Sequence, residues 1–422
     1  MAENSSEFKP YIPADKITPE FTITSILTGI ILAIVFGAAN AYLGLRVGMT
    51  ISASIPAAVI AMGITRIIFK KNSILESNMV QTIGSAGESV AAGAIFTMPA
   101  LFLWAKEGLI NQPSLLSISL ITLCGAILGV LFMIPLRNSI IVQEHGILPY
   151  PEAQACAEVL LAGEKKGSDA KAVFSGMAIA TLLISTILLK VSGDTGAHGM
   201  VSAITIGSII CVIAAIAGDT SQDLKTGYIL GATPKKQQIG ELVGAIISAL
   251  TIGGVLILLD SAWGFGSKEL AAPQATLMKL VTEGVMDGNL PWSYVFIGAA
   301  CTVLFELLGL PSLAVAIGIY LPIELTAPIM LGGVLRRLMD KKNKTQSSES
   351  SKGVLFCSGL IAGEGLMGVL LAILTVAGIA DKIGLGANIP AGVRLAGSVI
   401  LLVVLVTLIV CHNCSAKNEK AE

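Results

Sequence analysis

Apolar stretches recur along this chain, and each is long enough to cross a lipid bilayer as a helix. A hydrocarbon core of about 30 Å needs about 20 consecutive, mostly apolar residues. We expect such helices at 21–45, 47–69, 76–104, 114–136, 171–191, 199–217, 239–260, 291–310, 312–335, 354–380 and 391–411. Helices are favoured over a lipid-facing barrel because aromatic residues, which form the girdles of barrels, make up only 5% of the chain. The sequence therefore predicts an all-α, polytopic transmembrane helical bundle. The charged fraction of 13% leaves no room for a separate soluble domain.

The placement of charge predicts how the chain is organised across the membrane. Two basic clusters follow expected helices, and such clusters favour the cytoplasmic side. They are Arg66, Lys70 and Lys71, and then Arg336, Arg337, Lys341, Lys342 and Lys344. We expect a cytoplasmic N-terminal segment at 1–20, a transmembrane region at 21–337, a cytoplasmic hinge at 338–353, a C-terminal transmembrane part at 354–411 and a cytoplasmic tail at 412–422. An odd number of expected spans separates the two clusters. One stretch, with 76–104 as the first candidate, is therefore expected to be broken or re-entrant.

The tripeptide Ala-Gly-Glu occurs in two apolar stretches, at 86–88 and 362–364. Upstream of it, an offset of 270 residues pairs Gly48 with Gly318, Ala57 with Ala327, Gly63 with Gly333, Arg66 with Arg336 and Lys71 with Lys341. A linker six residues longer in the second copy then aligns Glu88 with Glu364. The shared order is a helix, a basic turn, a polar linker and an apolar stretch that contains the glutamate. This order predicts an internal repeat, which is parallel because both basic turns are expected on one side.

Glu88 is a carboxylate within a stretch otherwise suited to lipid. A charge near the bilayer centre costs about 2.5–3.5 kcal/mol, so such a residue is expected to face a partner, a cavity or a transported solute. Ser85 and Glu88 also match a capping box, in which both side chains satisfy free N–H groups where a helix begins. A helix that begins there has its positive end inside the membrane, where an anion can bind. Capping and a cavity role both stay open for Glu88, whereas Glu364 has Ile361 in place of the serine and is not explained by capping.

Polar residues in other apolar stretches extend this candidate site. Glu88 is the leading candidate for proton coupling or for pairing with a substrate amine. The further candidates for contact with substrate or protons are Asn78, Gln81, Ser85 and Ser89, Glu364 in the second copy, and Glu324 between Pro322 and Pro328 on a helix expected to be broken. Asp219, Asp223 and Lys225 fall in a polar stretch that we expect to be a loop. That loop is either a solvated turn with helix caps or a gating loop.

No pattern in the sequence predicts a metal site, a cofactor or an active site. The three histidines, His145, His198 and His412, lack metal-ligand spacing to one another, and phosphate-binding and hydrolase motifs are absent. A membrane-embedded enzyme would need a nucleophile and base or a metal constellation, so we expect no enzyme. The net charge of −1 gives no reason to expect a nucleic-acid partner.

Several blocks of the sequence carry a family resemblance. They are FKPYIPA at 8–14, NAYLGLRVGMTISASIPAAVI at 40–60, NMVQTIGSAGESVAAGAIFTMPAL at 78–101, HGILPYPEAQACAEVL at 145–160, GDTSQDLKTGYILGATPKKQQ at 218–238 and AVAIGIYLPIELTAPIMLGG at 314–333. With these blocks the chain resembles the oligopeptide transporter superfamily, which includes yellow-stripe-like carriers of metal chelates. It is similar to a prokaryotic member, yet shorter than usual, with the shortfall expected between Lys190 and Gly199.

The resemblance implies uptake of small peptides or peptide-like metal chelates, driven by the proton gradient. We expect a secondary transporter that works by alternating access in the plasma (inner) membrane. Its expected partners are the substrate, protons and the lipid bilayer, with a second copy of the chain as a further candidate. A passive channel or scramblase without ion coupling is the alternative.

Overall fold

The computed structural model describes residues 8–13, 15–48, 50, 52–70, 73–145, 147–148, 150–161, 184–193, 196–321, 323–343, 352–379 and 390–415. Within these residues the long elements are all helices, and no strand is present. The helices of the first half are α1 (Ile23–Val47), α2 (Ser54–Gly63), α3 (Ile74–Ile95), α4 (Pro99–Lys106), α5 (Leu115–Arg137), α6 (Pro151–Leu161) and α8 (Gly196–Leu230). Those of the second half are α9 (Pro234–Trp263), α10 (Pro273–Met286), α11 (Trp292–Leu307), α12 (Ser312–Tyr320), α13 (Ile323–Asn343), α14 (Lys352–Val376) and α16 (Ala391–Ser415).

Five helical segments of the described chain are long and apolar enough to cross a membrane. They are Ile23–Val47, Ile74–Lys106, Leu115–Gln143, Gly196–Leu230 and Pro234–Trp263. This confirms the prediction of an all-α, polytopic membrane bundle. One of these segments includes a π-helical turn, because η2 (Asn138–Gln143) directly continues α5. A further π-helical turn, η1 (Ile64–Ile68), extends the shorter α2.

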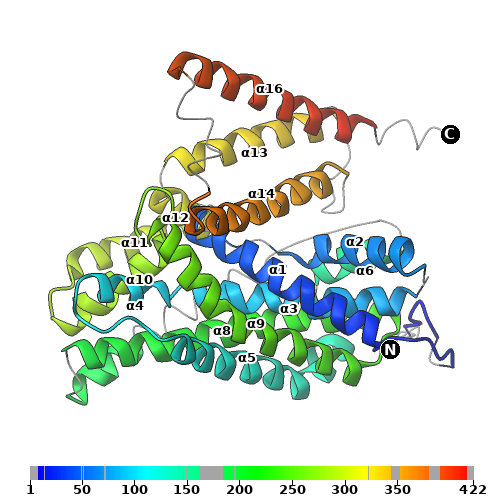
Figure 1. The fold of residues 1–422 in the computed structure, drawn as a ribbon, viewed down its shortest axis with the longest axis horizontal. Coiled ribbons are helices and arrows are strands. Elements are labelled where there is room, and N and C mark those ends of the chain that lie inside the picture. Colours follow the sequence, from blue (N-terminus) through cyan, green and yellow to red (C-terminus); the bar gives the residue numbers. More distant parts are fainter. Residues whose placement is uncertain are drawn as a thin grey trace.

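The most enclosed helix is α3, which lies at the centre of the bundle (Figure 1). In the most apolar part of the segment Ile74–Lys106, which contains α3, 89% of the residues are buried. The corresponding share for the segment Leu115–Gln143 is 39%. Helices α1, α8 and α9 pack around it, and α5 packs against α8 and α9 from outside. Glycines allow these backbones to approach, since a Cβ at Gly87 would overlap the backbone of Ala33 in α1. A Cβ at Gly244 in α9 would likewise overlap the backbone of Ile83 in α3.

Local sequence signals set the ends of several helices. Thr22 and Ser25 form a capping box at the start of α1, and Gly48 ends that helix in the left-handed conformation, with φ 79°. The hydroxyl of Ser73 accepts a hydrogen bond from the N–H of Glu76, so α3 begins there and not at Ser85. The capping box predicted at Ser85 and Glu88 is therefore wrong, because both residues lie well inside α3.

The C-terminal helices α13, α14 and α16 lie on one side of the bundle, and α14 is the one that packs against α1 (Figure 1). Helix α14 rests on α1, where Gly365 meets Ala39 and Leu43, and Gly368 meets Tyr42. The order of elements matches that of the first copy, since α2 precedes α3 and α13 precedes α14. Burial differs, however, because α3 is enclosed and most described residues of α14 are exposed. In the segment 338–353, residues 338–343 continue α13, 344–351 lie outside the described residues, and α14 begins at Lys352.

Candidate functional site

Glu88 lies inside α3 and is 1% exposed. Its Oε1 atom accepts a hydrogen bond of 2.7 Å from Nδ2 of Asn40 in α1. Its Oε2 atom accepts one of 3.3 Å from the backbone N–H of Ala53, the residue that caps the N-terminus of α2. The positive end of the α2 dipole therefore faces this carboxylate. Glu88 links three helices in this structure, and α3 runs unbroken around it from Ile74 to Ile95.

A second polar face of α3 turns towards α8. Nε2 of Gln81 donates to Oδ1 of Asp223 at 2.6 Å, and the hydroxyl of Ser85 donates to Oδ2 of the same carboxylate. Nε2 of Gln237 in α9 donates a hydrogen bond of 2.8 Å to the backbone carbonyl of Asp223. The predicted site residues of α3 thus fall into two separate groups. Gln81 and Ser85 contact Asp223 of α8, whereas Glu88 contacts Asn40 of α1.

The stretch that contains Asp219, Asp223 and Lys225 is helical and buried, so the prediction of a polar loop is wrong. All three residues belong to α8, and their exposed fractions are 5%, 1% and 1%. They are tolerated there because partners from other elements reach them. Nζ of Lys225 donates a hydrogen bond of 2.8 Å to the carbonyl of Ile141. The same atom lies 5.0 Å from the ring centroid of Tyr150 and 5.4 Å from that of Tyr228.

Glu241 of α9 completes a buried group that sequence reasoning missed. Asp219, Asp223 and Glu241, here called the acidic cluster, each offer a carboxylate oxygen within 4.8 Å of the others. Glu241 is 0% exposed. A sequence signal was present, because Glu241 lies between Gly240 and Gly244, a small-residue spacing typical of close helix contacts.

The remaining predicted residues are not brought to one place. Asn78 and Ser89 are buried in α3, and neither polar side-chain atom of Asn78 has a hydrogen-bond partner among the described residues. Glu364 lies on an exposed part of α14, in contrast to the buried Glu88. Glu324 belongs to α13, which runs unbroken through Pro328, and its side chain lies outside the described residues.

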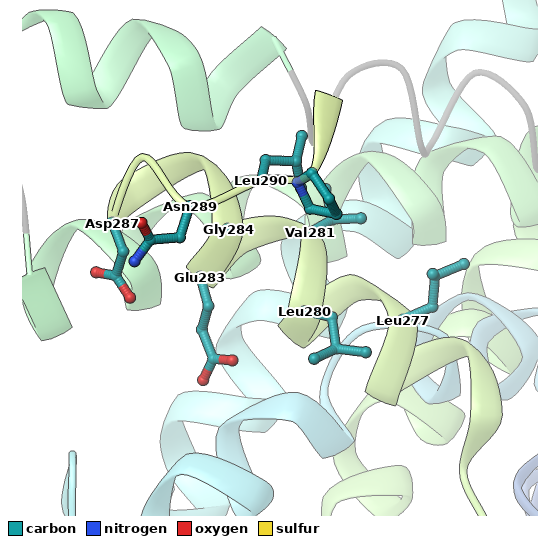
Figure 2. Close-up of a pocket in the computed structure, with 9 residues that line it drawn as sticks. Leu277, Leu280, Val281, Glu283, Gly284, Asp287, Asn289 and Leu290 are labelled. Carbon is teal, nitrogen blue, oxygen red and sulfur yellow. The ribbon is translucent and has the colours of Figure 1, made fainter. Parts of the chain in front are cut away.

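Two surface hollows lie away from Glu88 and from the acidic cluster. The larger, of about 430 Å³, is formed by α10 and the segment that follows it (Figure 2). Glu283 lines this hollow, where it accepts a hydrogen bond of 2.6 Å from Nε1 of Trp104. The smaller hollow, of about 210 Å³, lies between the N-terminal segment and the end of α8 and includes Phe8, Arg137 and Tyr228. Neither hollow is lined by a predicted site residue.

Near the smaller hollow, His145 packs against aromatic rings outside the long membrane segments. Its ring centroid lies 4.3 Å from that of Phe8 and 5.2 Å from that of Tyr228. Burial and the nearby charge of Lys225 lower the pKa of His145 below its ordinary value. The neutral imidazole is therefore the form that this packing favours.

Comparison with known proteins gives a match over most of the chain. The family model described as OPT oligopeptide transporter protein matches residues 20–179 and 171–375. This confirms the resemblance found in the sequence.

Individual relatives match over shorter stretches. A protein of Haemophilus influenzae described as a candidate oligopeptide transporter is 34% identical over 48% of this chain and 37% of its own length. A protein of Saccharomyces cerevisiae with the same description is 30% identical over 39% of this chain and 25% of its own length. A probable metal-nicotianamine transporter of Arabidopsis thaliana is 27% identical over 48% of this chain and 30% of its own length. The chain thus spans between a quarter and little more than a third of these relatives.

Proposed function

Because the chain belongs to the oligopeptide transporter family, we propose that it carries small peptides or peptide-like metal chelates across a membrane, driven by a proton gradient. The descriptions of its relatives support both substrate classes. The family is one of transporters, in agreement with the expectation that the chain is not an enzyme. Five long apolar helices support a multi-pass membrane protein, and we propose the plasma (inner) membrane as its location.

The observation that carries the proton-coupling proposal is the position of Glu88. Its carboxylate faces the N-terminus of α2, and such a charge–dipole contact is worth about 0.3–1 kcal/mol at a surface and up to about 2 kcal/mol when partly buried. Protonation would remove this attraction and weaken the hydrogen bond from Asn40. Proton binding at Glu88 would thus favour a different position of α2 relative to α3. A shift of this kind is what alternating access requires, since the proton must bind two conformations with different affinity.

Other predicted residues keep proposed roles within this scheme. Asn78 is a candidate for hydrogen bonding to substrate, because neither polar atom of its buried amide has a partner in the described part of the chain. Ser89 is a second neutral candidate on α3, and Gln81 and Ser85 would act through Asp223. We propose that Glu364 and Glu324 contribute from the second copy of the repeat.

The experiment that tests this function is uptake by proteoliposomes that contain the full chain. Labelled di- and tripeptides and an iron–nicotianamine chelate are offered with and without an inward proton gradient. We expect accumulation only with the gradient, and we expect Glu88→Gln to abolish it. Glu76→Gln is the matched control, because Glu76 is also a buried carboxylate of α3 and accepts a hydrogen bond of 2.6 Å from Thr22.

Each other outcome contradicts part of the proposal. Flux that equilibrates without dependence on the gradient would indicate a passive channel or scramblase. Gradient-driven uptake that is unchanged in Glu88→Gln would remove Glu88 from the coupling mechanism. Loss of uptake in Glu76→Gln as well would indicate that any change to a buried α3 carboxylate damages the fold.

A further inference from the structure

We infer that the acidic cluster and the side-chain oxygen of Gln81 bind one hard divalent cation of the size of Ca²⁺. The inference is independent of the transport proposal, because it concerns binding alone. It starts from three carboxylates on two helices, one oxygen of each lying within 4.8 Å of the others.

The first argument is charge. Three buried carboxylates so close together repel one another, and Glu152 of α6 adds a fourth carboxylate near Asp223. The cation on the same helix does not offset them, since the Lys225 ammonium is held by the carbonyl of Ile141 and two tyrosine rings. Buried charge of one sign requires neutralisation, either by protons or by a bound cation.

The second argument is unmet hydrogen-bonding capacity, and it favours a cation over protons. Apart from its contact with the carboxyl group of Asp223, Glu241 has no hydrogen-bond donor among the described residues, although it is 0% exposed. Oε1 of Gln81 is also buried without a donor, although Nε2 of the same amide binds Asp223. Shared protons can join carboxyl groups to one another, but they leave the amide oxygen unsatisfied. One cation would satisfy all of these oxygens together.

The third argument is register. Gln81 lies seven residues after the start of α3, Glu241 lies seven residues after the start of α9, and Asp223 lies seven residues before the end of α8. At 1.5 Å per residue, each side chain therefore projects about 10 Å inside its own helix end. The three packed helices thus present the side-chain oxygens of Gln81, Asp223 and Glu241 at a similar depth, about 10 Å from the ends of their helices.

The chemistry of the donor atoms and their burial select the ion. Carboxylate and amide oxygens are ligands for hard cations such as Mg²⁺ and Ca²⁺. Mg²⁺ demands near-ideal octahedral geometry and gives up its waters reluctantly, whereas Ca²⁺ accepts flexible sites built from protein oxygens. The cluster oxygens lie within 4.8 Å of one another, a separation that either ion can bridge, but the exposed fractions of Asp219, Asp223 and Glu241 are only 5%, 1% and 0%. A buried site built from protein oxygens favours Ca²⁺. The three negative charges favour a divalent over a monovalent ion.

The test is equilibrium dialysis of the purified full chain in detergent against ⁴⁵Ca²⁺, after removal of bound metal with a chelator. We expect one Ca²⁺ per chain and a rise in the thermal midpoint on Ca²⁺ addition. Glu241→Gln should weaken binding by at least about tenfold, the smaller loss known for outer-shell partners of metal sites. The matched control is Asp260→Asn, another carboxylate of α9, which pairs with Lys106 at 2.8 Å and should leave binding unchanged.

Asp219→Asn serves as a second variant where Glu241→Gln does not give folded protein, as judged by gel filtration. Absence of stoichiometric Ca²⁺ binding by the unchanged protein would overturn the inference, and so would undiminished binding in both variants. Stoichiometric binding of Mg²⁺ with none of Ca²⁺ would overturn the choice of Ca²⁺, which rests on the burial of the site.

Discussion

Replacing Gly87 with alanine should weaken this fold, whereas the same change at Gly363 should not. Both glycines are the middle residue of Ala-Gly-Glu, and both lie inside long helices. A Cβ at Gly87 would overlap the Cα, C and O atoms of Ala33, whereas a Cβ at Gly363 meets no atom of the described residues within 4 Å. Backbone atoms cannot rotate away as a side chain can. Helices α1 and α3 must therefore move apart to accept the methyl group.

The size of the effect follows from comparing the two variants. Exchange of glycine for alanine in a helix contributes about 0.5–1 kcal/mol of stability, and this gain is common to both positions. Overpacking of a close interface costs about 1–3 kcal/mol and applies at Gly87 alone. The difference in the free energy of unfolding between the variants is therefore about 1–3 kcal/mol. Gly363→Ala should be as stable as the unchanged protein or slightly more stable.

The assay is thermal survival of the full chain, measured as the monodisperse fraction by gel filtration after heating in one detergent. We expect the apparent midpoint of Gly87→Ala to lie below that of Gly363→Ala and of the unchanged protein. Equal midpoints for the two variants would refute the reasoning, because they would show that α1 and α3 are not in backbone contact at Gly87. A lower midpoint for Gly363→Ala would refute the exposed position of that glycine in α14.

Two further perturbations test other contacts. Asn40→Leu removes the 2.7 Å hydrogen bond to buried Glu88, so the free energy of unfolding should fall by about 1–3 kcal/mol, and unchanged denaturation would contradict the contact. For His145, whose pKa is lowered in the folded protein, stability is fully present above the ordinary value of 6.5 and is lost as the pH falls through the lower folded pKa. The thermal midpoint should therefore decrease below about pH 6.5 less steeply in His145→Phe than in the unchanged protein, and identical pH profiles would exclude this role.

The repeated tripeptide shows how the same local sequence acquires different surroundings. Glu88 is enclosed by α1 and the start of α2, whereas Glu364 is exposed on α14. Both were predicted from the cost of a charge in lipid, which depends only on the residue and its apolar flanks. Because of that free-energy cost, a buried charge is expected to have a partner. The sequence around the charge does not indicate which helix supplies that partner. Asn40, the partner of Glu88, is 48 residues away in the chain.

The sequence by itself determined the fold class, the family and the approximate positions of the helices. Hydropathy and length are sums over neighbouring residues, so stretches such as 21–45 and 391–411 were found close to α1 and α16. The presence of Glu88 within a membrane helix followed from the same local reasoning.

Only the tertiary structure decided that the polar stretch around Asp223 is a buried part of α8 and that Glu241 belongs with it. A run of Asp, Ser, Gln and Lys is locally typical of a solvated turn. It becomes helix interior when Gln81, 142 residues away, donates to Asp223 and the carbonyl of Ile141 accepts from Lys225. Burial of polar groups depends on such long-range pairing. Local composition cannot supply that information, because the pairing exists only once the helices have packed.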